Sequence, residues 1–178
     1  MRKLASLRQL FTQAIPELAR DPQRLIIQGD DGHLVATGTG TLSFEYRYTA
    51  SITVLDYTGH ADAIMVPLLA WVQTNQGELL DNPQRRENAI RFAIAPLDSG
   101  ACDIGIDIDL TESAIVRPQP DHPTRLTITH PPEPGHIGLT RFDGQPIVQE
   151  ERWELWLKDQ KLAEWQLLPP AAKTYFGL

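Results

Sequence analysis

The most obvious chemical feature of this chain is a row of aspartates at alternating positions, Asp103, Asp107 and Asp109. In a strand, alternate side chains point to the same side, so the three carboxylates would form one acidic row. Hard divalent cations prefer oxygen ligands, whereas a channel that passes DNA would use such a row to keep phosphates from sticking. The simplest alternative is the solvated face of an ordinary sheet. With no calcium-loop pattern present, we predict a channel wall or a solvent-facing row, and no metal site.

Three histidines, His122, His130 and His136, lie in a proline-rich stretch close to Glu133. Imidazole is a common metal ligand. Their spacing matches no zinc pattern, and the single cysteine of the chain adds too little to complete one. We interpret them as loop histidines and predict neither a metal nor a cofactor.

Other charged and aromatic residues suggest contact surfaces between subunits. Glu45 and Arg47 share the polar side of one predicted strand, where they would form an ion pair or dock a neighbour. Trp153 and Trp156 would lie on opposite faces of their strand, so one side of a single sheet cannot bury both. Together with Trp165 they form a tryptophan-rich hairpin, which either contacts another subunit or packs on its own domain.

Local catalytic motifs are absent from the sequence: there is no nucleophile elbow, no phosphate-binding glycine loop with lysine and no zinc-protease helix. Residues 38–40 (GTG) lack the third glycine of a dinucleotide motif and are interpreted as a turn. A dispersed catalytic triad is recognised only by its geometry. A small-molecule-binding or enzymatic α+β domain therefore stays an alternative, which a cleft lined by convergent polar groups would support.

Composition favours one domain with an acidic body. The 178 residues carry a net charge of −7, which argues against nonspecific binding to nucleic acid or anionic membranes. Residues 1–24 carry a net charge of +3 and the rest of the chain carries −10. The basic N-terminal segment of one subunit could contact the acidic body of the next, although solvated charge is the simpler interpretation. Cys102 is expected in the core. No signal-peptide or membrane-spanning pattern is present, so we expect assembly in a reducing cytoplasm.

Hydrophobic periodicity predicts the elements that would position these residues. In the first half we expect an amphipathic helix over 4–14, a helical turn over 17–20, a hairpin of strands 25–27 and 34–36 around a turn at 29–32, a long strand over 42–54, a turn at 56–59 and a helix over 61–76.

The second half is predicted as a loop over 81–87, a hairpin of strands 90–97 and 102–110, and a final hairpin of strands 153–157 and 161–167. Between these hairpins, prolines punctuate an extended arm that contains a possible short strand over 125–129. We predict an α+β fold: a mostly antiparallel twisted sheet with two main helices on one face, plus the arm and the C-terminal hairpin. The expected parts are residues 1–117, 118–150 and 151–178.

An ordered set of segments resembles the tail completion protein R family of contractile-tailed temperate phages, over roughly residues 1–117. The matching segments are residues 6–18 (SLRQLFTQAIPEL), 44–48 (FEYRY), 56–59 (DYTG), 67–72 (PLLAWV), 102–104 (CDI) and 110–112 (LTE). No segment is a strong motif alone, but their order and spacing together are specific.

The resemblance implies a structural virion protein and not an enzyme. Such proteins complete or terminate the head-proximal end of a phage or phage-like tail. The implied assembly is a hexameric ring on tube and sheath proteins that presents a surface to the head–neck connector and lets DNA pass without specific binding. A head-side neck connector is the alternative within the same neck, and no membrane partner is implied. The long strand, the arm and the aromatic hairpin suit a closed head-to-tail interface.

Overall fold

The computed structural model describes residues 1–36, 38, 40–132 and 143–167. Its elements in chain order are α1 (Arg2–Ala14), α2 (Pro16–Arg20), the 3-10 helix η1 (Pro22–Arg24), β1 (Leu25–Ala36), β2 (Phe44–Tyr57), α3 (Asp62–Asn75), α4 (Glu78–Asp81), α5 (Pro83–Arg86), β3 (Ile90–Pro96), β4 (Cys102–Gln119), β5 (His122–Thr129), β6 (Glu151–Leu157) and β7 (Gln160–Leu167). The predicted α+β class is confirmed.

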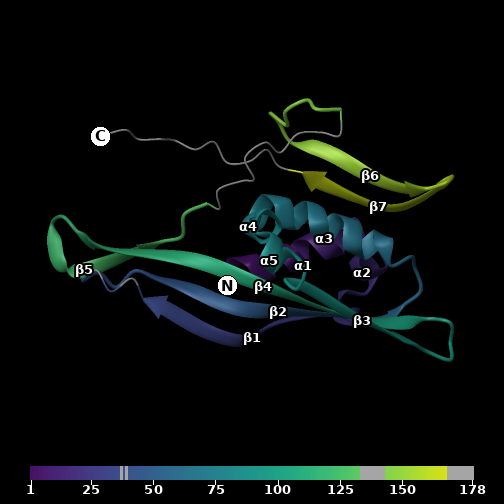
Figure 1. Ribbon diagram of the computed structural model, residues 1–178, viewed down its shortest axis with the longest axis horizontal. Coiled ribbons are helices and arrows are strands. Elements are labelled where there is room, and N and C mark those ends of the chain that lie inside the picture. Colours follow the sequence, from purple (N-terminus) through teal and green to yellow (C-terminus); the bar gives the residue numbers. More distant parts are fainter. Residues whose placement is uncertain (37, 39, 133–142, 168–178) are drawn as a thin grey trace.

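Three layers make up the molecule (Figure 1). The first is an antiparallel sheet of five strands in the order β1-β2-β4-β3, in which β5 pairs with the far part of β4. Helices α1 and α3 pack against each other on one face of this sheet, as predicted. The β6–β7 hairpin forms the third layer, because β7 contacts both helices from the side away from the sheet.

The long central strands alternate between two environments. On β2, Ala50, Ile52 and Val54 are buried beneath the helices, whereas Ser51 and Thr53 lie on the opposite face. Strand β4 is 18 residues long and repeats this alternation from Ile104 to Ala114. The predicted long strand is therefore confirmed, and it pairs on both sides along most of its length.

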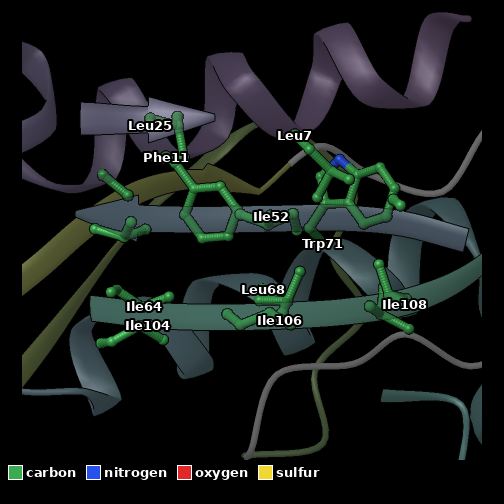
Figure 2. Packing of buried hydrophobic residues seen from close by; sticks show 14 of the residues in the cluster. Leu7, Phe11, Leu25, Ile52, Ile64, Leu68, Trp71, Ile104, Ile106 and Ile108 are labelled. Atoms are coloured by element: carbon green, nitrogen blue, oxygen red, sulfur yellow. The ribbon is translucent and has the colours of Figure 1, made fainter. Parts of the chain in front are cut away.

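The core lies between the sheet and the two helices (Figure 2). Leu7 and Phe11 of α1 and Leu68 of α3 point at the isoleucines of the sheet, and each of the three is at most 1% exposed. Burying a side chain of this size stabilises the fold by about 1.5–3 kcal/mol. This cluster fixes which face of the sheet is left for other contacts.

Residues 25–36 do not form the hairpin predicted from their glycines. They are one strand, β1, which pairs with β2 on both sides of a register shift between Asp30 and His33. Asp31 takes a left-handed conformation with φ 52° at this point. The glycine–aspartate run therefore makes a bulge, because β2 is long enough to pair with both halves of β1.

The loop predicted over residues 81–87 is also wrong, because it contains the end of α4 and all of α5. The Asn82 side chain accepts a hydrogen bond from the Gln84 N–H at 3.0 Å, and Pro83 occupies the first turn of α5. Asparagine as N-cap followed by proline is a normal helix start. In the helix predicted over 61–76, which is observed as α3, Pro67 lies inside the helix and beyond its first turn.

Strand β4 is longer than predicted and continues through the division expected after residue 117. The possible short strand over 125–129 is confirmed as part of β5, which pairs with β4. The final hairpin is confirmed as β6 and β7.

Candidate assembly surfaces

The aspartate row lies on the sheet face that points away from the helices. Asp103, Asp107 and Asp109 alternate along β4 with isoleucines that are at most 1% exposed on the helix side. Asp103 accepts a hydrogen bond from the Asp56 N–H at 2.9 Å. Asp107 accepts one from the Ser51 hydroxyl at 2.7 Å. Both of these carboxylates are therefore oriented by neutral donors.

Asp109 differs from its neighbours in the row because a cation pairs with it. The Arg91 guanidinium of β3 lies 3.0 Å from an Asp109 carboxylate oxygen, and the Thr49 hydroxyl donates to the same carboxylate at 3.2 Å. The hydrogen bond with Asp109 is the main cause that raises the pKa of Arg91. The acidic row is therefore neutralised at one end only.

The described residues contain no group of three or more histidines, cysteines or carboxylates placed to hold a metal ion. Within this part of the chain, His122 begins β5 and His130 follows it, with its Nδ1 3.1 Å from the Ser113 carbonyl oxygen. His136 lies outside the described residues.

A hollow of about 640 Å³ is lined by residues of β1, β2, β4 and the α4–α5 segment. Its charged side chains largely pair with one another: Arg47 Nε lies 2.6 Å from Glu45 Oε1, and Arg85 lies 3.9 Å from Glu78. The ion pair predicted between Glu45 and Arg47 is confirmed, whereas docking of a neighbour by these residues stays a prediction. Because its charges are paired, the hollow presents no concentrated charge of one sign to a ligand.

The three hairpin tryptophans occupy different environments. Trp165 is 6% exposed and packs into the main core. Trp153 lies opposite it on β6 and is half-buried. Trp156 is 53% exposed, and its indole N–H donates to Glu154 at 3.0 Å. Trp165 is thus covered by its own chain, which leaves Trp156 as the tryptophan best placed for an intersubunit contact.

A groove of about 170 Å³ runs between α1, α3 and β7, lined by both polar and apolar side chains. On its walls, the Trp71 indole N–H donates to the Ser6 hydroxyl at 2.9 Å. The Trp165 indole nitrogen, by contrast, is buried with no hydrogen-bond partner among the described residues. The groove is smaller than an ordinary ligand pocket, so it supports the small-molecule alternative only weakly.

A buried polar cluster that the sequence did not reveal fixes the start of α1. The Glu112 carboxylate of β4 accepts hydrogen bonds from the backbone N–H groups of Arg2 and Lys3 at 2.9 and 3.1 Å, and from the Tyr48 hydroxyl at 2.5 Å. Burial alone would raise the pKa of Glu112, but the bonds from Tyr48 and the two amides outweigh it, so the pKa lies below its usual value. The cluster ties the helix layer to the sheet.

Large apolar side chains are exposed at both ends of the sheet, on the face that elsewhere packs against the helices. At one end Phe92 is 63% and Ile94 42% exposed on the edge strand β3. The other end is formed by β5 and the end of β1, which lie beyond the helices in Figure 1. There Leu34 is 63%, Leu126 49% and Ile128 54% exposed. Clustered exposed apolar groups of this kind mark interaction surfaces. Alternation in the sequence shows the face of a strand on which such residues lie but not what covers that face.

The exposed apolar side chains at both ends of the sheet are typical of a protein that binds other subunits. Comparison with known proteins identifies its family. A family model described as P2 phage tail completion protein R matches residues 1–134. A relative named tail completion protein R, from Escherichia phage P2, is 30% identical over 165 residues, which cover 93% of this chain and 99% of the relative. The chain belongs to the P2 phage tail completion protein R family, so it is a structural protein of phage tails and the resemblance noted in the sequence is confirmed.

No solved structure matches the chain. Among the described residues, none of the helices is both long and apolar enough to cross a membrane.

Proposed function

We propose that this protein completes the head-proximal end of a contractile phage or phage-like tail. Copies of the chain form a homo-hexameric ring on the last tube and sheath subunits, and the ring offers its other side to the head–neck connector proteins. The number six is taken from the resemblance to tail terminators. The ring is part of the virion, is assembled in the host cytoplasm and lets DNA pass without binding it specifically.

The observation that carries this proposal is the exposed apolar surface at both ends of the sheet in a chain of this family. Phe92 on β3 and Leu34 on β1 lie on strands at opposite edges of the same sheet. A closed ring needs two different surfaces on every copy that meet head to tail. The edge strands β1 and β3 supply these two surfaces, and the apolar end at Leu34 is left for a contact with tube, sheath or neck proteins.

The aspartate row supports a bore that passes DNA. Asp103 and Asp107 accept hydrogen bonds from neutral donors on the sheet face away from the helices, and the chain as a whole carries −7. Negative charge facing a channel repels phosphate and keeps a passing DNA strand mobile. Termination itself needs no chemistry, because a ring bound to the last tube subunits covers the surface to which another subunit would add.

The proposal is tested by electron microscopy of the purified protein alone and mixed with isolated tail tubes. Sixfold rings at one end of each tube are expected. A stable monomer with no affinity for tubes would contradict the proposal. Rings that bind isolated heads and ignore tubes would instead show a head-side connector.

A further inference from the structure

We propose that strand β3 of one copy adds to strand β1 of the next copy, so that the ring is built on one continuous antiparallel sheet. This inference rests on the proposed ring and names the contact that forms it. The occupant of the exposed β3 edge is therefore a second copy of this chain.

Both edges of the sheet are open within the part of the chain that the structure describes. The order β1-β2-β4-β3 places β1 and β3 at the two ends, and neither pairs with a further strand there. Edge strands carry a row of unpaired backbone groups that favours pairing with another chain. With seven residues in β3 and 12 in β1, the shorter edge fits within the longer one.

The directions of the strands suit this joint. Each neighbouring pair along the order is antiparallel, so β1 and β3 run in opposite directions. A rotation about an axis along the strands keeps their direction, so β1 of the next copy would meet β3 antiparallel. The helix layers of both copies would then lie on the same side of the shared sheet. An even number of alternating strands thus lets the pattern repeat around a closed ring.

One register brings together complementary side chains. Placing Arg91 opposite Asp30 of the next copy lets its guanidinium, which already pairs with Asp109, bridge two carboxylates on the outer face. Phe92 then lies opposite Gly29, beside Leu4, Tyr48 and the 57% exposed Met1, whose side chains lie 3.3–3.4 Å from the position that a Cβ would take. An aromatic ring across from a glycine covers apolar groups that are otherwise open to solvent.

Two further pairs of the same register support it. Ile94 falls opposite the half-buried Ile27, so the exposed apolar side of β3 meets the inner side of β1. On the outer face, Ala95 falls opposite Ile26, which is 44% exposed. The polar face with its aspartates would then continue from copy to copy around one side of the ring.

Cysteine cross-linking tests the contact directly. In a Cys102→Ser background, the variant with both Ala93→Cys and Gln28→Cys places its thiols on neighbouring copies at this joint. Oxidation, or treatment with a short bifunctional thiol reagent, should produce a ladder of covalent oligomers on a non-reducing gel. The matched control pairs Ala93→Cys with Thr53→Cys, which is on the same face but inside the sheet, and should give no ladder. Rings without a ladder would overturn the strand joint and leave the proposed function intact, whereas the absence of any oligomer would contradict both.

A charge on the edge provides a second, independent test. Phe92→Lys should raise the protein concentration needed for half-assembly by more than about ten-fold, because an edge lysine opposes strand addition. Leu126→Lys is the control, since Leu126 is similarly exposed but lies on β5, away from the joint. Light scattering measures assembly, and circular dichroism checks that both variants are folded. Equal assembly by the two variants would overturn the inference.

Discussion

The middle and the ends of the main sheet carry the same inward-facing apolar pattern, but only the middle is covered by the chain itself. Ile106 in the middle is 1% exposed beneath the helices, whereas Phe92 on the adjacent edge strand is 63% exposed. The two residues are directly opposite each other in the strand pairing. Alternation therefore decides which face a residue occupies, while the length of the helix layer decides whether that face becomes core or contact surface.

This difference separates folding from assembly within one sheet. Substitutions in the covered middle should act on the free energy of unfolding. Those at the uncovered ends should leave stability almost unchanged and act on contacts with other subunits. The following predictions test that division, beginning with the largest expected effect.

Truncation in the covered middle should be costly. Ile106→Ala leaves a cavity between β4 and the helices, and we expect the free energy of unfolding to fall by about 3 kcal/mol. Ile94→Ala on the edge strand should cost less than about 1 kcal/mol, because Ile94 is 42% exposed. Chemical denaturation of both variants measures the difference. Equal losses would mean that the edge is covered in the free protein.

Removing the charge of Glu112 should have the next largest effect. Glu112→Gln weakens the bonds to the first amides of α1 and to Tyr48, and we expect a loss of about 2 kcal/mol at pH 7. The pKa of Glu112 in the folded protein lies below its ordinary value of 4.5. Its contribution is therefore complete above the unfolded-state pKa and is lost as the pH falls through the folded-state pKa.

The pH dependence of stability separates the contribution of the Glu112 charge from the contribution of its side-chain shape. Stability of the unmodified protein should decline as the pH falls below 4.5, the ordinary pKa of the group, and the decline should be shallower in the glutamine variant. Denaturation midpoints at a series of pH values measure both slopes. Parallel curves would show that the carboxylate charge contributes nothing to the helix start.

The two most buried tryptophans offer a matched comparison, since each is 6% exposed. Trp71→Phe removes a hydrogen bond to Ser6. This loss should lower the free energy of unfolding by about 1 kcal/mol, in addition to the effect of the smaller buried apolar area. Trp165→Phe removes a buried indole N–H with no partner among the described residues. Removing the desolvation cost of that N–H offsets the loss of buried apolar area. Thermal unfolding of both variants should show the larger decrease for Trp71. A larger decrease for Trp165 would indicate that its indole nitrogen is bonded in the folded protein.

How much could be predicted from the sequence follows from the same division. The alternation of residues 42–54 and 102–110 predicted long strands and their faces, and the aspartates do lie opposite the buried isoleucines. Helices α1 and α3 were predictable because their apolar residues recur at helical spacing, whereas α5 was missed. Glu112 was missed because its partners, Tyr48 and the amides of Arg2 and Lys3, are at least 64 residues away in the chain.

The errors have local physical reasons. The run Gly29 to Gly32 contains ordinary turn residues, and only the length of β2 makes it a bulge. Phe92 is exposed because the helix layer does not extend over β3. The sequence of β3 itself contains no information on how far that layer extends. The sequence left open whether the hairpin tryptophans pack on their own domain or on another subunit, because only the fold shows that Trp165 on β7 packs into the core and that Trp156 is exposed.

The smallest effect on stability is expected at the end of the sheet formed by β4 and β5. Ile128→Thr changes a side chain that is 54% exposed, keeps the β-branched shape that suits a strand, and should alter the free energy of unfolding by less than about 0.5 kcal/mol. If this end contacts tube, sheath or neck proteins, the same variant should still form rings but bind tubes more weakly. Sedimentation of rings with isolated tubes measures that binding, and Thr127→Ser on the opposite face of β5 is the control. A loss of stability comparable to that of Ile106→Ala would remove the distinction between covered and uncovered parts of the sheet.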